Sequence, residues 1–225
     1  MVGDRTGESL IRLIDALTTN HTSFLRERAH FDFLRDVVTG ELRDASELRL
    51  WSAACSTGEE PYSIAMYLLD SSQSSVCRWA RGLRILATDI STRVLEKARK
   101  GIYPDERFHG VPETWWRNYL LKGQGEAAGW YKVKPAVASL ITFERLNLIE
   151  PLPRRSFQII FCRNVLMYFD KPTQQDIVAR LAECLEPGGY LFVGHAEALT
   201  SIEHRLSYVR PAVYKKDKPG FRRRP

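Results

Sequence analysis

The chain has 225 residues, 44% of them hydrophobic and 27% charged, which fits one large domain with a buried core and excludes a wholly disordered chain. Its net charge of +6 and pI near 9.2 would suit a nucleic-acid partner. However, residues 215–225 hold six of the 33 Lys and Arg and one of the 27 acids, so the first 214 residues sum to +1. A near-neutral body argues against a nucleic-acid surface, and we expect the basic tail to be disordered.

The four cysteines stand at positions 55, 77, 162 and 184 without a CxxC pair or a histidine at ligand spacing, so we expect no metal site and no disulfide scaffold. Reduced thiols suit the cytoplasm. The N-terminus lacks the pattern of a signal peptide, and no stretch approaches the roughly 20 apolar residues that cross a bilayer. We therefore expect a cytoplasmic protein without membrane insertion.

Apolar spacing predicts two helices at the start of the chain, over 9–18 and 24–39, separated by a polar loop. Strands and helices then alternate. We expect strands at 48–54, 84–88, 141–146, 157–162 and 190–194, and one or two more within 206–214. Helices are expected at 61–70, from Ser91 to Gly101, and after Asp170. Residues 102–139 interrupt the alternation, and we expect an inserted subdomain with short antiparallel strands. This order predicts an α/β fold, with a mostly parallel sheet covered by helices on both faces.

Polar residues follow three of the expected strands, in the turn 55–60, at Asp89, and after Cys162. Ligands of such sheets bind at the carboxyl ends of the strands. The turn has one glycine and no lysine, so pyrophosphate is a poor candidate. Gly58 would let the backbone approach a ligand, and the carboxylates of Glu59 and Glu60 would suit an ammonium or hydroxyls; alternatively, these two acids complement the dipole of the following helix.

Asp89 occupies the position where nucleoside-binding sheets hold the two ribose hydroxyls. The alternative, a helix N-cap, is already supplied by Ser91. Asn147 follows the next strand, where its amide could meet an adenine edge, although an asparagine at such a place is more often a turn residue.

Together these segments resemble the chemotaxis-receptor methyltransferases of the CheR family. The matching motifs are Thr18–Glu27, Trp51–Ser63, Ile85–Ile90, Phe161–Asp170 and Leu185–Leu191. The resemblance implies a Rossmann-like class I methyltransferase fold with a mostly parallel seven-stranded sheet. It also implies methyl transfer from S-adenosylmethionine, with S-adenosylhomocysteine as product, to glutamate side chains of chemoreceptors.

The resemblance places the family's site on particular residues of this chain. Arg26 and Tyr168 would lie nearest the transferable methyl. The expected cofactor contacts are Asn20, Thr22, Arg26, Glu59, Asp89, Asn147, Leu148, Cys162, Arg163 and Asn164. The reaction needs no general base, because a glutamate carboxylate is ionised at neutral pH. It needs alignment and exclusion of water, and Arg26 can orient a carboxylate bidentately. Tyr168 would hydrogen-bond the carboxylate or wall the methyl pocket, and without the resemblance it could equally be a core tyrosine. We expect structural or loop roles for His21 and His195, and no metal.

We divide the chain into residues 1–40, with N-terminal helices and a cofactor-contacting loop, residues 41–214, the methyltransferase domain with the insertion at about 102–139, and the tail 215–225. Family members usually begin with a larger helical domain that helps engage the receptor, whereas about 17 residues precede Thr18 here. The acceptor could therefore be another protein or a small carboxylic acid, or the chain could be a non-catalytic cofactor-binding module. We expect a monomer. In some members the insertion docks a receptor peptide by strand addition; strand 130–134 is a candidate for this, although its aromatics could form the subdomain's own core.

Overall fold

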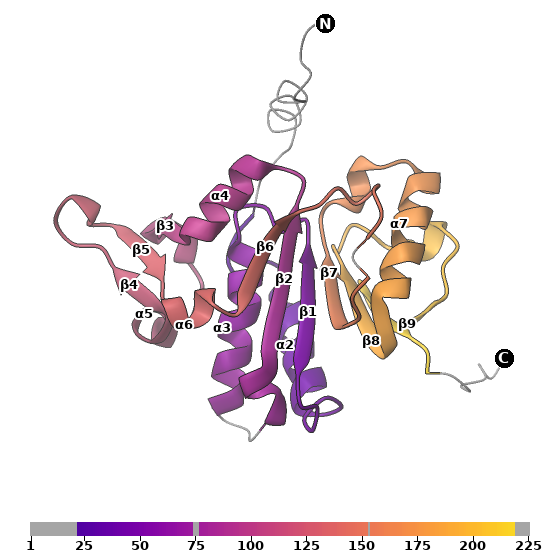
Figure 1. The fold of residues 1–225 in the computed structure, drawn as a ribbon, viewed down its shortest axis with the longest axis horizontal. Coiled ribbons are helices and arrows are strands. Elements are labelled where there is room, and N and C mark those ends of the chain that lie inside the picture. The colour runs from indigo at the N-terminus through magenta and orange to yellow at the C-terminus, as the bar shows by residue number, and fades with distance from the viewer. Residues whose placement is uncertain (1–21, 74–76, 153, 219–225) are drawn as a thin grey trace, which may run out of the picture.

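The structure is a computed structural model that describes residues 22–73, 77–152 and 154–218. A seven-stranded sheet runs through the centre of the protein (Figure 1). Its strands in spatial order are β6 (Ile141–Arg145), β2 (Leu83–Asp89), β1 (Leu48–Ala53), β7 (Phe157–Cys162), β8 (Leu185–Val193), β10 (Val213–Lys216) and β9 (Leu206–Arg210). The first five are mutually parallel, and β10 and β9 pair antiparallel at one end. The predicted fold class is confirmed.

The chain order of the strands reverses at the pairing of β1 with β7. From β1 the chain proceeds outward to β2 and β6, and then crosses back to β7 on the other side of β1. In the register of this pair, Ala53 lies opposite Cys162, so the two strands end side by side. The loops that leave the two strands diverge here, which opens a crevice at the carboxyl edge of the sheet.

The helices begin and end largely where local sequence signals place them. They are α2 (Arg28–Thr39), α3 (Glu59–Gln73), α4 (Thr92–Lys100), α5 (Glu113–Tyr119), α6 (Pro135–Ala138) and α7 (Lys171–Cys184). Short 3₁₀ turns, η1 to η5, occupy Arg78–Gly82, Asp105–Phe108, Gly125–Ala127, Leu166–Tyr168 and Leu199–Ser201. The Ser91 hydroxyl caps α4 by accepting the Val94 N–H, and Asp170 caps α7 through the Thr173 N–H at 3.0 Å.

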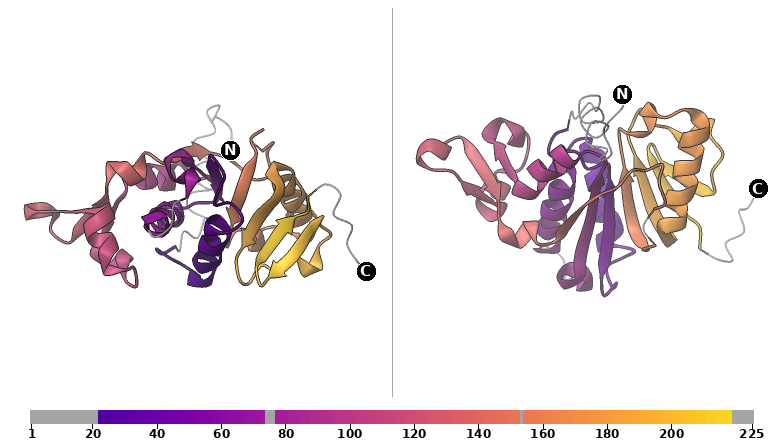
Figure 2. Two further views of the ribbon diagram at one scale, coloured as in Figure 1. Left: turned by 90° about the horizontal axis from the view of Figure 1, so that it is seen from below. Right: turned by 45° about the horizontal axis from the view of Figure 1, so that its top comes forward.

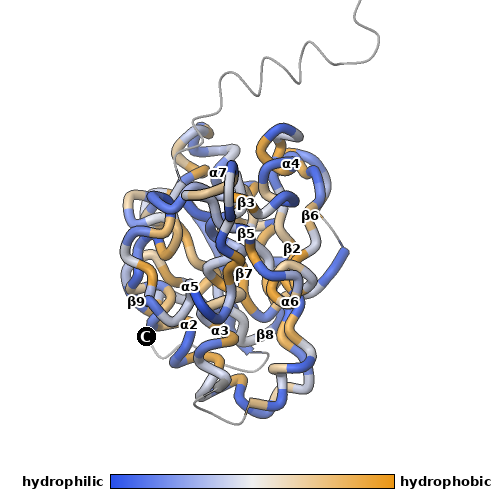
Figure 3. The backbone as a smooth tube through the Cα atoms, turned by 90° about the vertical axis from the view of Figure 1, so that its left-hand side faces the viewer, coloured by the Kyte–Doolittle hydropathy of each residue, from blue (hydrophilic) through white to orange (hydrophobic). Residues whose placement is uncertain are grey.

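Apolar side chains of the sheet alternate between two cores. Leu48 and Leu50 of β1 face the core under α2 and α3, whereas Trp51 and Ala53 face the core under α7. In Figure 1, α7 lies in front of the sheet and α2 behind it, and Figure 3 shows hydrophobic stretches along the interior of the backbone with hydrophilic outer turns. None of the described helices is long and apolar enough to cross a membrane.

The insertion forms a three-stranded antiparallel sheet in the order β3 (Ile102–Pro104), β5 (Trp130–Val133), β4 (Leu120–Lys122). This sheet projects from the side of the molecule away from α7 (Figures 1 and 2). Strand β5 is its central strand, so the expectation that 130–134 is a docking edge was wrong, because both sides of its backbone are already paired. Tyr131 packs on Trp116 at 4.7 Å between ring centroids, which makes it part of the subdomain's core.

Several other boundaries differ from the prediction, including those of α3, which begins two residues earlier and ends three residues later than expected. Helix α2 begins at Arg28 rather than Phe24, because Leu25 and Glu27 adopt positive φ values of 53° and 59° that interrupt a helix. Strand β8 begins at Leu185, since its pairing with β7 shifts register and residues 186–189 bulge instead of forming a separate turn. Strand β10 extends to Lys216, so the first two residues of the expected tail belong to the sheet. The helix expected at 9–18, Asn20, His21 and residues 219–225 of the expected tail lie outside the described residues.

Candidate active site

A cavity of about 570 Å³ lies at the carboxyl edge of the sheet, beside the crevice between β1 and β7. This volume is ordinary for a small-molecule site. Its walls come from the loop before α2 and from the segments that follow β1, β2, β6 and β7. The lining residues are Thr22, Ser23, Arg26, Phe31, Ala54, Cys55, Ser56, Glu60, Asp89, Ile90, Leu146, Asn147, Leu148, Ile149, Arg163, Asn164, Val165, Met167, Tyr168 and Phe169.

Asp89 anchors the floor of this cavity at the end of β2. One carboxylate oxygen accepts the Ser56 N–H at 2.8 Å, and the other accepts the Ser91 N–H at 3.0 Å. The turn after β1 is thereby tied to the end of β2, with Ala54 and Ser56 held at positive φ. Each carboxylate oxygen has two lone pairs, so the oxygen that holds a backbone N–H can also accept a hydroxyl. A buried carboxylate with two separate oxygens therefore fits the two hydroxyls of a ribose.

Gly58 and Glu59 do not serve the cavity in the way expected from the sequence. A Cβ atom on Gly58 would lie 2.9 Å from both the Ala98 side chain and the Tyr103 hydroxyl, so the close approach is to α4 and the subdomain, not to a ligand. Glu59 is 1% exposed; it accepts a hydrogen bond from the Thr57 hydroxyl at 2.6 Å and lies 3.7 Å from Arg107. Burial raises the pKa of Glu59 despite these two partners.

The end of β6 brings Asn147 and Leu148 to the cavity wall. The Asn147 side-chain oxygen accepts the Ile149 N–H at 3.3 Å, which is the turn role noted as the alternative for this asparagine. The amide still lines the cavity, so the turn also fixes its orientation there. Leu148 is buried beside it and contributes an apolar surface.

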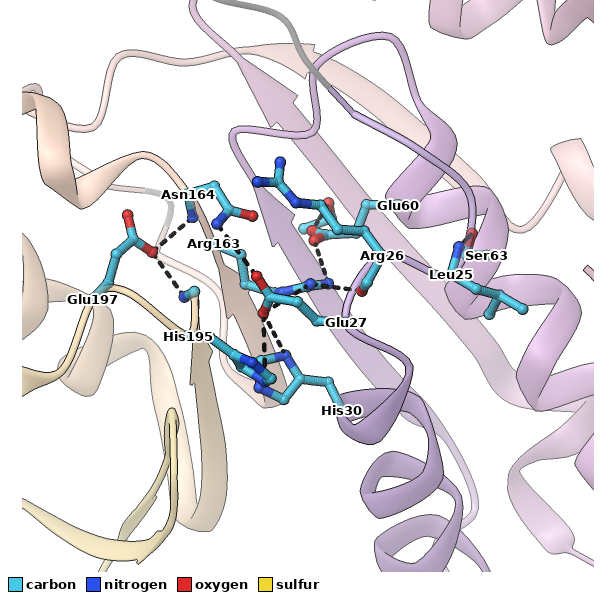
Figure 4. Close-up of polar contacts among 12 residues, drawn as sticks. Leu25, Arg26, Glu27, His30, Glu60, Ser63, Arg163, Asn164, His195 and Glu197 are labelled. Carbon is cyan, nitrogen blue, oxygen red and sulfur yellow. Dashed lines mark hydrogen bonds and ion pairs between the residues drawn. The ribbon is translucent and has the colours of Figure 1, made fainter. Parts of the chain in front are cut away.

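A buried guanidinium, that of Arg163, joins the elements that form the cavity (Figure 4). The Arg163 side chain is 1% exposed and forms ion pairs of 3.1 Å with Glu27 and with Glu60. Its Nη2 also donates to the Arg26 carbonyl at 2.6 Å. Glu60 in turn accepts the Ser52 hydroxyl of β1 at 2.7 Å. A single cation thus fixes the loop before α2 against β1, α3 and β7.

The ionisation of the two carboxylates reflects this arrangement. Burial opposes the charge of Glu27, but Arg163 and the Asn164 amide outweigh burial and hold the pKa of Glu27 below its ordinary value. For Glu60, burial dominates over Arg163 and Ser52, and its pKa is raised. The negative charge nearest Arg163 is therefore favoured on Glu27.

Another carboxylate, that of Glu197, shapes the opposite wall. One of its oxygens accepts the backbone N–H groups of Asn164 at 2.6 Å and Gly194 at 2.7 Å, and the other accepts that of Met167 at 3.3 Å. Asn164 sits at φ 58°, a left-handed conformation that the surrounding bonds maintain. Through these bonds Glu197 holds the segment that ends in Tyr168.

The loop before α2 presents Arg26 to the cavity from between two residues at positive φ. Besides the Arg163 bond to its carbonyl, the Leu25 N–H donates to the Ser63 hydroxyl of α3 at 3.0 Å. Strained backbone of this kind is common at functional sites, where the surroundings determine it. Arg26 is therefore positioned by its neighbours on both sides.

Most of the residues expected from the sequence meet at this one cavity. Those that line it are Thr22, Arg26, Asp89, Asn147, Leu148, Arg163, Asn164 and Tyr168. Glu59 and Cys162 do not; Cys162 is fully buried in β7, where burial raises the pKa of its thiol. Tyr168 is 62% exposed, so the alternative of a core tyrosine was wrong.

The sequence interpretation missed Glu27, Glu197 and Ser56 as site-forming residues. Glu197 follows the parallel strand β8 by four positions, and an acid after a strand end was a signal that could have identified it. Glu27 adjoins the expected Arg26 but has no local pattern of its own. Ser56 acts through its backbone N–H, a group that every residue except proline has, so its residue type gave no signal.

The chain matches the family model "CheR methyltransferase, SAM binding domain" over residues 20–214. It is 43% identical over 206 residues to a chemotaxis protein methyltransferase of Escherichia coli, covering 89% of this chain and 68% of that protein. For the chemotaxis protein methyltransferase of Borreliella burgdorferi the identity is 40% over 216 residues, with 92% and 74% covered.

Among solved structures, it is similar to the DszA carbon methyltransferase, with a TM-score of 0.45, 15% identity, and 85% and 36% of the two chains covered. A similar likeness is found to an S-adenosylmethionine-dependent methyltransferase from Clostridium acetobutylicum, with a TM-score of 0.41, 15% identity, and 84% and 56% covered. By its match to the family model and its identity with the two chemotaxis relatives, the chain belongs to the CheR methyltransferase family.

Proposed function

We propose that this chain transfers the methyl group of S-adenosylmethionine to glutamate side chains of chemoreceptors. Family membership and relatives named chemotaxis protein methyltransferases support this assignment. The observation that carries it is the meeting of Asp89, Arg26 and Tyr168 at one cavity on the carboxyl edge of the sheet. That arrangement combines a ribose-binding acid with a cation able to receive a carboxylate.

The residues around the cavity suit the parts of the cofactor. Asp89 would accept the two ribose hydroxyls, one on each carboxylate oxygen. Asn147 and Leu148, at the end of β6, would hold the adenine through one amide and one apolar surface. Thr22, Arg163 and Asn164, around the crevice between β1 and β7, would then lie along the methionine part. When bound, S-adenosylmethionine supplies an electrophilic methyl group on a sulfonium.

The acceptor carboxylate needs no proton removed, because glutamate is ionised at neutral pH. Arg26 would receive that carboxylate with its guanidinium and fix the attacking oxygen in line with the methyl group. The Tyr168 hydroxyl would donate a hydrogen bond to the same carboxylate from the opposite wall. Together the two side chains would exclude water that otherwise solvates the nucleophile.

Arg163 and Glu197 would position these two groups. Arg163 holds the backbone of Arg26, and Glu197 holds the backbone that leads to Tyr168. The acceptor therefore meets a preformed pair of groups, so that less conformational entropy is lost when it binds.

The assignment is tested by transfer of a tritiated methyl group to a purified chemoreceptor cytoplasmic domain, with release of the label by mild alkali as the mark of an ester. We expect Arg26→Ala to abolish transfer and to leave S-adenosylhomocysteine binding within about tenfold of the wild type, one decade being about 1.4 kcal/mol. Arg28→Ala is the matched control, because Arg28 is an exposed arginine two residues away that does not line the cavity.

Calorimetry that detects no S-adenosylhomocysteine binding to the wild type would refute the proposal. Transfer to a small carboxylic acid, with none to the receptor domain, would show that the acceptor is wrong while the cofactor is right. Cofactor binding without transfer to either acceptor would instead identify a non-catalytic binding module.

A further inference from the structure

A cluster of two histidines and a glutamate lies outside the cavity, on the α2 side of Arg163. Glu27 and His30 come from the start of α2, and His195 comes from the loop after β8. Figure 4 shows both imidazole rings directed at the Glu27 carboxylate. The Glu27 Oε2 is 3.4 Å from His30 Nδ1 and 3.8 Å from His195 Nε2, and one ligand atom from each residue lies within 4.8 Å of the other two. None of the three lines the cavity.

His30 makes this cluster unusual, because its side chain is only 3% exposed and neither ring nitrogen has a hydrogen-bond partner in the part of the chain that the structure describes. A buried polar group without a hydrogen bond costs free energy and requires an explanation. The ring adjoins the Glu27 carboxylate and the His195 ring, and the centroids of the two imidazoles are 4.8 Å apart. Glutamate and histidine are both residue types that bind metal ions.

We propose that Glu27, His30 and His195 bind one divalent transition-metal ion of the zinc class. Tetrahedral zinc with bonds of about 2.0–2.1 Å separates its ligand atoms by about 3.3 Å, close to the 3.4 Å between Glu27 Oε2 and His30 Nδ1. The His195 side chain is 54% exposed, so its ring is able to move toward Glu27 and His30 and close the remaining distances, which are 3.8 Å to Glu27 Oε2 and at most 4.8 Å to the His30 ligand atom. Its exposure also leaves room for water as the fourth ligand.

The charges around this site are of both signs. Arg163 lies 3.1 Å from the Glu27 Oε2 and also pairs with Glu60, so its positive charge is shared between two carboxylates. The guanidinium weakens binding by repulsion, so the site differs from a permanent structural zinc site.

The test is titration of the metal-free full chain with Zn²⁺ by calorimetry and with Co²⁺ by visible absorption. We expect one equivalent of each ion and a Co²⁺ spectrum without a thiolate band. His195→Ala is expected to lose at least tenfold in Zn²⁺ affinity. Because His195 is exposed, this variant should fold, which S-adenosylhomocysteine binding checks independently. His109→Ala, which removes another exposed imidazole far along the chain, is expected to bind like the wild type.

The proposal fails if the wild type binds no Zn²⁺, if His195→Ala binds within threefold of the wild type, or if His109→Ala loses as much. A thiolate band with Co²⁺ would also overturn it, since it would place the ion on a cysteine. None of these results depends on methyl transfer, so the metal site and the proposed function can fail separately.

Discussion

Replacing Asp89 with asparagine tests the floor of the cavity, because the change preserves shape and removes one acceptor. The carboxylate holds the Ser56 N–H at 2.8 Å and the Ser91 N–H at 3.0 Å on separate oxygens. An asparagine has one oxygen, so one of these buried N–H groups would face an NH₂ group. An unsatisfied buried donor costs about 1–3 kcal/mol. At about 2–4 °C per kcal/mol for a chain of this size, Tm should fall by about 4–8 °C for a ~2 kcal/mol loss.

The loss of cofactor affinity should be larger than the loss of stability suggests. Each ribose hydroxyl would bond to a charged oxygen, and such bonds contribute about 1.5–3 kcal/mol. Asp89→Asn removes one acceptor oxygen and the negative charge on the remaining one. The expected loss of binding free energy is about 3 kcal/mol, which corresponds to an increase of about 100-fold in Kd for S-adenosylhomocysteine. Asp89→Ala should bind too weakly for calorimetry to detect.

The matched control is Asp105→Asn, which neutralises an exposed acid in η2 outside the cavity. We expect its affinity and Tm to equal those of the wild type. An Asp89→Asn protein that folds and binds S-adenosylhomocysteine within threefold of the wild type would refute the assignment of this acid to the ribose.

Other changes test the remaining walls. Arg163→Met should cost about 3–5 kcal/mol in urea unfolding, because it leaves two partly buried carboxylates without their cation, and a loss under 1 kcal/mol would contradict that role. Tyr168→Phe should slow methyl transfer by about 10- to 100-fold, the worth of a hydrogen bond to a carboxylate, with S-adenosylhomocysteine affinity unchanged; an unchanged rate would make Tyr168 only a wall. A Cβ on Gly194 would lie 2.6 Å from the Asn164 amide, so Gly194→Ala should lose about 1–3 kcal/mol and disturb this wall; a stability equal to the wild type would exclude the clash. Burial raises the pKa of Glu59 above its ordinary 4.5, so the contribution of this carboxyl to stability falls as pH rises above 4.5; the unfolding free energy of Glu59→Gln should therefore increase relative to that of the wild type over this rise, and a constant difference between the two would contradict this.

Local sequence signals predicted the helices and strands well, because the ends of each element depend on residues that are adjacent in the sequence. Ser91 and Asp170 cap the helices that follow them, as their positions before apolar stripes indicate. The strand ends at Asp89 and Cys162 located the site because parallel strands bring their carboxyl ends to one edge. The order of elements was therefore enough to predict where the cavity lies.

Contacts between distant residues were not predictable in this way. Glu27 and Arg163 meet across 136 positions of chain, and nothing near either residue indicates the other. The same holds for Glu59, whose sequence position suggested a ligand contact but whose carboxylate turns to Thr57 and Arg107. Whether β5 is an edge strand or a central strand depended on its pairing, and in the structure β3 and β4 pair with it on either side.

The Arg163 ion pairs also bear on the order in which the protein assembles. Glu27 and Glu60 belong to the first third of the chain, whereas their common cation is supplied only after β7 has been added to the sheet. Closing so long a loop is entropically costly and tends to occur late in folding. During synthesis, the segments that carry Glu27 and Glu60 would lack their common cation until residue 163 has left the ribosome. The loop that carries Arg26 would therefore be among the last parts of the molecule to reach its native conformation.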